Sequence, residues 1–384
     1  MNLIVLNESI ECEWFDKVDK RCAITPVSVK ALIRLGIEVS LQAGSGEKAG
    51  YVDEDYLAAG AEVFTNPGRA LSTADVFLTV NPPTTNAIAL VPQNCIVIGH
   101  LDPFFQEPLV KAIATRGLTA ISVEMIPRSS RAQKMDALSS QASLAGYVMM
   151  LQAANQYASI LPMMMTPSGT IKPAKVFIIG AGVAGLQAIA TARRMGASVL
   201  AYDTRDVVAE QVESLGAKFL KIDIGESGQT KDGYANELTE EQKQRQADGQ
   251  KAAIIDADIV ITTAQLFGRR PPRLISADVV KQMRPGSIIV DMAAQSGGNV
   301  EGSVTGETVI QQGVKIIGNG DWAQQVAKAA TDMYANNLLN LIDEFFNADS
   351  KNLEINFEDE IIRGCVVTHA GAICNDMLTK AYSE

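Results

Sequence analysis

Short apolar runs alternate with amphipathic stretches along the first part of this chain. Each run has the length and the β-branched content of a strand, and each stretch between runs has the spacing of a helix. This alternation is typical of a parallel sheet with helices on both faces. The expected strands are Asn2–Leu6, Glu38–Gln42, Val63–Phe64, Val76–Thr79, Cys95–Ile98 and Thr119–Ser122, and the expected helices are Pro26–Leu35, Asp53–Ala59 and Glu107–Arg116.

The second part of the chain repeats the alternation. A tail with a strand at Cys365–Thr368 and a short helix is too small to fold alone, so we expect it to return to the first domain. The pattern predicts an α/β fold with two doubly wound, Rossmann-like domains, mainly parallel sheets and a cleft between them. The expected domains are residues 1–138 with 328–384, and residues 139–327. The expected elements of the second part are Val176–Ile179, Val183–Met195, Ser198–Tyr202, Phe219–Ile222, Asp258–Thr262, Ser287–Met292, Lys315–Gly318 and a helix at Gln324–Phe346.

The stretch Ala137–Ile171 contains no charged residue, and its middle, Ser143–Met165, has the length of a membrane span. Polar side chains nevertheless recur at helical spacing and form a stripe on one face. We therefore expect a helix packed between domains and ended by Pro162, with no span through a bilayer. The stripe consists of Gln152, Asn155, Gln156 and Ser159.

A glycine-rich turn directly follows the apolar run Val176–Ile179, and Gly180, Gly182 and Gly185 have the spacing G-x-G-x-x-G. The first glycine permits a tight turn, the second lets the backbone approach a pyrophosphate, and the third lets helix and strand pack closely. The N–H groups at the start of the following helix would face the phosphates. This pattern predicts dinucleotide binding, and a Rossmann-like domain that has lost its ligand is the alternative.

Asp203 ends the next strand, about twenty residues after the turn, where an acid accepts hydrogen bonds from both hydroxyls of the adenosine ribose. A 2′-phosphate would be repelled there, which favours NAD(H) over NADP(H). Arg205 lies close by and is the usual kind of residue for a 2′-phosphate, so the preference is not absolute. Residues 223–249 form a long polar stretch with Tyr234 as its only aromatic residue, and we expect a mobile lid or a disordered loop.

A second group of polar residues lies at Ile126–Gln141, just before the uncharged helix. It includes Arg128, Gln133, Asp136 and Ser139. One interpretation is a capped helix start with a solvated charge cluster. The other is a polar clamp facing the cleft, in which Arg128 binds a carboxamide or phosphate oxygen, Asp136 orients that arginine, and the two neutral side chains add hydrogen bonds.

Composition narrows the function classes. The net charge of −11 over 384 residues argues against nucleic-acid binding. Five scattered cysteines without a paired motif suggest reduced thiols in the cytoplasm, and two histidines without a Cys/His cluster predict no metal site. The N-terminus lacks the basic region of a signal peptide.

Several segments together make the chain similar to one family. It resembles the NAD(H)-binding component of proton-translocating nicotinamide nucleotide transhydrogenases over nearly its whole length, and the loop that contains Arg128, Gln133 and Asp136 is the most specific mark. The segments are RSSRAQKMDALSSQASLAGY, PMMMT, GAGVAGLQAIATARRMGA, EQVESLGAKF, DIVITTA, RPGSIIVDMAAQSGGN and FEDEIIRGCVVTHAGAI.

The resemblance implies an oxidoreductase that passes hydride directly from NADH bound here to NADP⁺ held by a partner subunit, with Re/Si specificity and coupling to proton translocation through transmembrane subunits. It also implies a homodimer, peripheral on the cytoplasmic face of the inner membrane, and the chain's end at Glu384 resembles the split-subunit version. Direct transfer between two nicotinamides needs alignment and no protein acid or base.

The resemblance assigns residues as well. Arg128, Gln133, Asp136 and Ser139 would hold the nicotinamide end, with Gln133 also reaching the second nucleotide, and Tyr234 would close with the mobile loop. The remaining expected nucleotide contacts are Gly180, Ala181, Gly182, Val183, Ala184, Gly185, Asp203, Thr204, Arg205, Ala264 and Gln265.

The chain departs from the family pattern at its start, where only Arg21-Cys22-Ala23 survives, so the role of the first loop is open. Two other functions remain as alternatives. An amino-acid dehydrogenase of the alanine dehydrogenase kind is favoured by Arg21 and His100, which match its substrate residues, but Asn81 lies where its lysine is expected. An NAD(H)-sensing module without turnover is the other, and the intact Arg128–Ser139 set argues against it.

Overall fold

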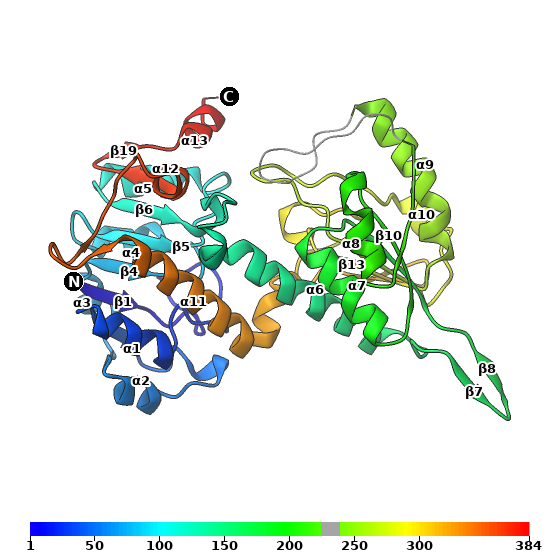
Figure 1. Cartoon of the computed structure of the whole chain (residues 1–384), viewed down its shortest axis with the longest axis horizontal. Coiled ribbons are helices and arrows are strands. Elements are labelled where there is room, and N and C mark those ends of the chain that lie inside the picture. Colours follow the sequence, from blue (N-terminus) through cyan, green and yellow to red (C-terminus); the bar gives the residue numbers. More distant parts are fainter. Residues whose placement is uncertain (224–238, 384) are drawn as a thin grey trace. The chain divides into compact units, whose positions relative to one another are not determined.

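The computed structural model describes residues 1–223 and 239–383. The chain divides into two compact units, Met1–Gln141 with Gln324–Glu384, and Ala142–Ala323. Each unit has a central sheet with helices packed on it (Figure 1). The predicted α/β class with two doubly wound domains and mainly parallel sheets is therefore confirmed, whereas the cleft between the domains stays a prediction.

The first unit is built on an eight-stranded sheet with the order β19-β18-β6-β5-β4-β1-β2-β3. Strands β6 to β3 in this order are parallel, and β18 adds to β6 in the antiparallel sense, so the end of the chain joins the first sheet. The strands of this sheet are β1 (Asn2–Val5), β2 (Glu38–Gln42), β3 (Glu62–Phe64), β4 (Val76–Leu78), β5 (Ile96–Gly99), β6 (Thr119–Ser122), β18 (Val366–His369) and β19 (Ala372–Ile373).

The predicted strands and helices of residues 1–122 agree with the structure to within one residue at each end. Helix α1 shows why the local signals suffice, because Thr25 caps its first turn, Pro26 begins it and Val29 and Leu32 bury one face. The helices of this unit are α1 (Pro26–Arg34), α2 (Asp53–Ala59), α3 (Pro67–Leu71), α4 (Thr85–Leu90), α5 (Glu107–Thr115), α11 (Ala327–Phe345), α12 (Glu360–Cys365) and α13 (Asp376–Ala381).

The second unit has a seven-stranded sheet with the order β11-β10-β9-β12-β13-β15-β14. The first six strands of this order are parallel, and the order of the strands reverses between β9 and β12, which is the switch point where a Rossmann sheet binds its ligand. The strands are β9 (Lys175–Ile179), β10 (Ser198–Tyr202), β11 (Lys218–Phe219), β12 (Ile259–Thr262), β13 (Ile288–Asp291), β14 (Thr308–Gln311) and β15 (Val314–Ile317).

Helix α6 (Ala137–Gln156) ends earlier than the sequence predicted, so Ser159 lies outside it and Pro162 does not end it. Lys315 donates from Nζ to the carbonyl of Gln156 at 3.0 Å and caps the helix end. The chain then turns so that Pro162 packs on Gly196, where an added Cβ would lie 2.6 Å from the proline Cβ. Among the residues that the structure describes, no helix combines the length and apolar character needed to cross a membrane.

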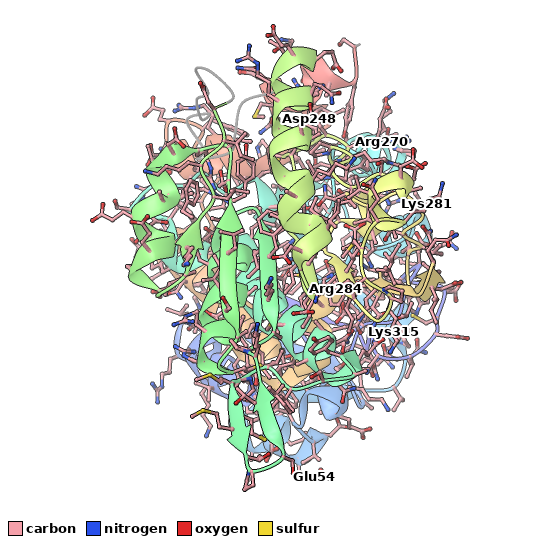
Figure 2. The ribbon with its side chains drawn as sticks, turned by 90° about the vertical axis from the view of Figure 1, so that its right-hand side faces the viewer. Glu54, Asp248, Arg270, Lys281, Arg284 and Lys315 are labelled. Carbon is pink, nitrogen blue, oxygen red and sulfur yellow. The ribbon has the colours of Figure 1, made fainter. Side chains whose placement is uncertain are left out.

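The expected loop at residues 223–249 is wrong in its second half, because α9 covers Glu240–Asp256. Thr239 caps this helix and Gln242 completes a capping box. The buried face is formed by Gln246, Gln250 and Ile254, so its glutamines hid the helical periodicity. Arg284 lies at the C-terminal end of α9 and donates to the Asp256 carbonyl at 2.7 Å (Figure 2). Tyr234 lies outside the described residues.

A hairpin of β7 (Met164–Thr166) and β8 (Gly169–Ile171) extends from the second unit, as Figure 1 shows. It was not expected from the sequence, since it falls in the uncharged stretch. Met163 and Met165 on it are 59% and 72% exposed, a high value for apolar side chains. The remaining helices of the second unit are α7 (Val183–Arg194), α8 (Ala209–Ser214) and α10 (Ala277–Val280).

Candidate functional site

The glycine turn connects β9 to α7 at the switch point of the second sheet. Gly180 has a φ of +98°, a conformation that favours glycine. A Cβ on Gly185 would lie 1.9 Å from the Gly180 carbonyl oxygen, so only glycine allows α7 to approach the strand so closely. A Cβ on Gly182 would meet no atom within 4 Å, which leaves that side of the turn open.

This turn fits a dinucleotide phosphate. The first N–H groups of a helix have no acceptor within the helix, and in the described chain no side chain caps the start of α7. Those groups and the positive end of the helix dipole therefore remain available to an anion beside the open face of Gly182. Helix α6 buttresses the turn, because a Cβ on Gly146 would lie 2.1 Å from the Ala184 carbonyl oxygen.

Asp203 directly follows β10 and is only 8% exposed. One of its oxygens accepts the Ala181 N–H at 2.7 Å, which ties the acid to the glycine turn. Arg205 binds the same carboxylate through its own N–H and through Nε and an NH₂ group, each at 2.9 Å. These bonds use about four lone-pair positions, all that a carboxylate has. A ribose that bonds to Asp203 must therefore displace the guanidinium of Arg205.

The segment after β12 contains a contact that sequence reasoning missed. Thr263 donates to the Gly180 carbonyl at 3.1 Å and so joins the two strands at the switch point. Behind it, the buried Asn299 donates to the carbonyl oxygens of Ala264 and Pro272 at 2.9 and 2.8 Å. The buried carboxylate of Asp291 accepts the N–H of Asn299 in turn. Gln265 is exposed and Ala264 half-buried. These bonds fix the backbone on which Ala264 and Gln265 lie, and their contact with nucleotide stays a prediction.

The loop Arg128–Ser139 lies in the first unit and leads into α6. Asp136 begins the helix by accepting the N–H of Ser139 at 2.9 Å and the hydroxyl of the same residue. The helix start is thus capped, as one of the two interpretations expected. Arg128 and Gln133 are exposed, whereas Asp136 and Ser139 are half-buried. The structure brings Asp136 and Ser139 together, and the roles of all four in binding stay predictions.

The other charges of this loop form surface ion pairs. Lys134 contacts Glu344 at 2.7 Å, and Arg131 contacts Asp359 and, at 3.8 Å, the same glutamate. The hydrogen bond from Asp359 raises the pKa of Arg131, and the arginine lowers the pKa of Asp359. Exposed pairs of this kind contribute little to stability. They match the solvated charge cluster that the sequence suggested and leave Arg128 and Gln133 as the candidate ligands.

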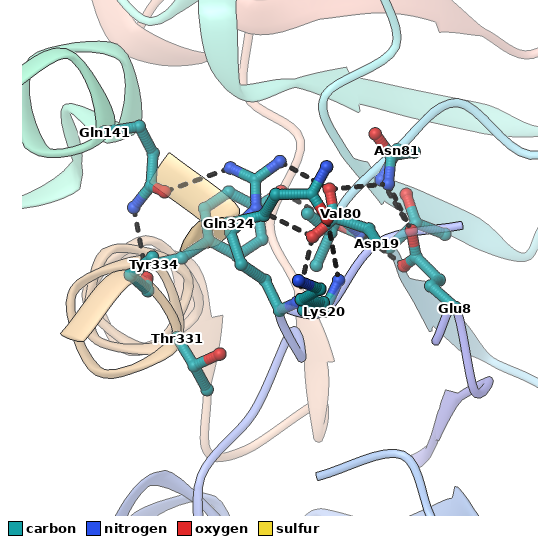
Figure 3. A network of polar contacts seen from close by, with 12 residues as sticks. Glu8, Asp19, Lys20, Val80, Asn81, Gln141, Gln324, Thr331 and Tyr334 are labelled. Atoms are coloured by element: carbon teal, nitrogen blue, oxygen red, sulfur yellow. Dashed lines mark hydrogen bonds and ion pairs between the residues drawn. The ribbon is translucent and has the colours of Figure 1, made fainter. Parts of the chain in front are cut away.

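A buried polar network lies in the first unit, away from this loop's surface (Figure 3). Arg21 is bound by Asp19 through two hydrogen bonds of 3.0 and 2.7 Å. Its remaining NH₂ group donates to Gln141 at 3.0 Å. Asn81 donates from Nδ2 to Glu8 at 2.9 Å and to Asp19 at 3.2 Å. Arg21, which the sequence matched to a substrate arginine, is therefore engaged by a carboxylate of the same chain.

Burial and charge act in opposite directions on the two acids of this network. Desolvation raises the pKa of Glu8 to about 7, although Val80 and Asn81 donate hydrogen bonds to it. Burial acts on Asp19 as well, but the charge and hydrogen bonds of Arg21 outweigh it and hold the pKa below its usual value. Asp19 therefore carries the charge that balances Arg21, and Glu8 is the acid that titrates near neutral pH.

His100, the other residue matched to a dehydrogenase, is held by structural contacts. Its ring stacks on Tyr334 with centroids 5.3 Å apart, and its Nδ1 lies 3.7 Å from Glu124. The hydroxyl of Tyr334 donates to the Thr79 carbonyl at 2.8 Å. Burial raises the pKa of Glu124, but its bonds with His100 outweigh this effect and the pKa is lowered. The described residues contain no group of three or more His, Cys, Asp or Glu that could hold a metal ion.

Comparisons with known proteins agree with this geometry. Residues 9–145 match the model of the alanine dehydrogenase/PNT N-terminal domain, and residues 149–376 match that of the alanine dehydrogenase/PNT C-terminal domain. A relative from Rhodospirillum rubrum, named as a component of NAD(P) transhydrogenase subunit alpha, is 42% identical over 368 residues, which cover 94% of this chain and 96% of that protein.

Solved structures give the same result. A transhydrogenase structure from Sinorhizobium meliloti superposes with a TM-score of 0.85 and 40% identity, covering 97% of this chain and all of that one. An L-alanine dehydrogenase superposes with a TM-score of 0.80 at 24% identity, over 100% of this chain and 99% of that one, and this likeness shows a shared fold. The chain therefore belongs to the alanine dehydrogenase/PNT family and groups there with NAD(P) transhydrogenase subunit alpha.

Proposed function

We propose that this chain is the NAD(H)-binding subunit of a proton-translocating NAD(P)⁺ transhydrogenase. The carrying observation is the glycine turn beside Asp203, in a chain whose relatives of high identity are named transhydrogenase subunit alpha. In this function, hydride passes directly between NADH on this subunit and NADP⁺ on a partner subunit, and membrane subunits couple the transfer to proton movement.

The residues of the second unit bind the adenosine half of the cofactor. The N–H groups at the start of α7 hold the pyrophosphate beside Gly182, and Asp203 accepts the ribose hydroxyls after Arg205 moves aside. Bound NADH supplies the hydride. Arg128, Gln133, Asp136 and Ser139 hold the nicotinamide end and align it, with Asp136 and Ser139 keeping the loop in shape. Alignment is the main requirement of such a transfer.

The buried network argues against an amino-acid dehydrogenase. Such an enzyme needs a free cation for the carboxylate of its substrate. Here Arg21 is already neutralised by Asp19, and Asn81 in place of a lysine is bound between two carboxylates. A substrate carboxylate would have to replace a buried ion pair, which is costly.

The finer assembly is also part of the proposal. The subunit is a homodimer, peripheral on the cytoplasmic face of the inner membrane, and the transfer is Re/Si-specific. The exposed methionines of the β7–β8 hairpin support self-association, since such apolar surface is usually covered by a partner. Sedimentation of the wild type and of a Met163→Ser/Met165→Ser variant tests this point, because a variant that remains as dimeric as the wild type removes the hairpin from the interface.

The reaction itself is tested by mixing the chain with the NADP(H)-binding subunit. We expect hydride exchange between NADH and an NADP⁺ analogue, and slower exchange with Gln133→Asn at nearly unchanged NADH affinity. An NAD(H)-sensing module would bind NADH and give no exchange. Rapid NADH oxidation with pyruvate and ammonia would instead establish the amino-acid dehydrogenase.

A further inference from the structure

Helix α11 holds the Gln133 turn through one side chain. Asn337 is 8% exposed and points from α11 at the loop Arg128–Ser139. Its Nδ2 donates to the Lys134 carbonyl at 3.0 Å, and its Oδ1 accepts the Ser140 hydroxyl at 2.8 Å. One amide group therefore contacts the loop on both sides of Asp136 and Ser139.

We propose that Asn337 is a positioning residue for hydride transfer, which sets the orientation of Gln133 toward the nicotinamide. The proposal rests on the function proposed above, in which Gln133 touches the nucleotides. It adds a residue from α11, about two hundred positions away in the sequence and outside every motif that identified the loop.

The geometry explains how Asn337 acts through Gln133. Lys134 directly follows Gln133, so a hydrogen bond to the Lys134 carbonyl orients the second peptide plane after the Gln133 Cα. The short helical turn Gln133–Met135 is otherwise held by a 2.8 Å bond between Met135 and Ala132 and by a 3.3 Å bond from Asp136 to Gln133. Gln133 is exposed, so its own side chain is positioned only through this backbone.

The second contact of Asn337 joins the turn to α6. Ser140 lies in the first turn of α6, next to Ser139, whose N–H and hydroxyl bind Asp136. Gln141, one residue later, is held by Arg21 and donates to the Ala330 carbonyl at 3.1 Å. The helix start is thus fixed by the buried network, and Asn337 transmits this fixed position to the turn.

The fold does not depend on Asn337 alone, which makes the proposal testable. Asn340 also donates to the Lys134 carbonyl, at 3.3 Å, and the Ser140 hydroxyl has a second acceptor in the Ala137 carbonyl at 3.1 Å. Replacing Asn337 with leucine, a side chain of similar size, therefore leaves both loop groups with a partner. We expect a folded variant with a less precisely held turn.

The experiment compares Asn337→Leu with Asn336→Leu, its exposed neighbour on the same helix. Each full-length variant is combined with the NADP(H)-binding subunit, and single-turnover hydride transfer from NADH to an NADP⁺ analogue is measured. We expect Asn337→Leu to slow transfer about tenfold or more, because small misplacements cost that much in an aligned reaction. NADH affinity and melting temperature should stay close to wild type, and Asn336→Leu should transfer at the wild-type rate.

Amide hydrogen exchange gives a readout apart from activity. Asn337→Leu should speed exchange at residues 133–140 and leave the glycine turn unchanged. A wild-type transfer rate in Asn337→Leu overturns the inference, and so does a loss of rate that a lowered melting temperature accompanies. Gln133→Leu separates the two levels of the proposal. If that variant is slow and Asn337→Leu is not, the proposed function stands and the inference fails; if Gln133→Leu transfers normally, the role of the loop itself is wrong.

Discussion

Asp203→Asn tests how this chain chooses its nucleotide. The carboxylate lies beside the glycine turn, bonded to the Ala181 N–H at 2.7 Å and to Arg205 at 2.9 Å. Asparagine keeps the shape of the side chain and one acceptor oxygen but removes the charge. The substitution therefore changes the electrostatic repulsion of a 2′-phosphate without creating a cavity. It also removes the anionic partner of the Arg205 guanidinium.

The size of the effect follows from these distances. A unit charge on a 2′-phosphate about 4 Å from Asp203 is repelled by about 4 kcal/mol at an effective dielectric constant of about 20. Arg205 carries the opposite charge close by and cancels part of this, which leaves about 2 kcal/mol, or about thirtyfold in Kd. NADH loses charge-assisted hydrogen bonds to its ribose, worth about 1–2 kcal/mol more than neutral ones, or about tenfold.

We therefore expect Asp203→Asn to bind NADPH about thirtyfold more tightly and NADH about tenfold more weakly than the wild type. Titration of both nucleotides by calorimetry measures the two constants directly. Asp206→Asn is the matched control, because Asp206 is exposed three residues further along. An unchanged ratio of the two affinities in Asp203→Asn, or an equal change in Asp206→Asn, would refute the electrostatic reasoning.

Three further predictions concern stability and binding. Gly185→Ala places a Cβ against the Gly180 carbonyl, so urea unfolding should show a loss of about 1–3 kcal/mol and NADH binding should fail, whereas Gly182→Ala should lose NADH binding alone; equal stability losses in both would contradict this. Asp19→Leu leaves the buried charge of Arg21 unbalanced and should cost about 3–5 kcal/mol, most of which Asp19→Leu/Arg21→Met should recover; a double variant no more stable than the single one would disprove the pairing. Burial raises the pKa of Glu8 from 4.5 to about 7, so its neutral form favours the folded state, and wild-type stability should fall relative to Glu8→Gln as the pH rises through this window, by up to about 3 kcal/mol; a difference that does not vary with pH would contradict this.

Local signals predicted those parts of the fold in which sequence and tertiary packing agree. The strands of the first sheet are almost continuously apolar, and α1 carries a cap, a proline start and an apolar face, so its bounds followed directly. Helix α9 escaped detection because its buried face contains Gln246 and Gln250, and a polar helix buried against a sheet has no apolar periodicity to read. The end of α6 was misplaced because Lys315, distant in sequence, caps it.

The candidate site divides in the same way. The glycine turn, Asp203 and the Arg128–Ser139 loop could be named from the sequence because each is a contiguous motif with its own chemistry. The partners of these groups are distant along the chain. Thr263 on the turn and Asn337 behind the loop carry no signal of their own, since a threonine after a strand and an asparagine in a helix are common.

The sequence by itself determined the fold class, the dinucleotide turn and the family resemblance, because backbone conformation, hydrophobic period and motif spacing are local properties. Only the tertiary structure decided that Arg205 already binds both oxygens of Asp203 and that Asp19 balances Arg21. It also decided that α11 supports the Gln133 turn. Charges and hydrogen bonds depend on distances of a few ångströms between residues far apart in the chain, and only packing sets those distances.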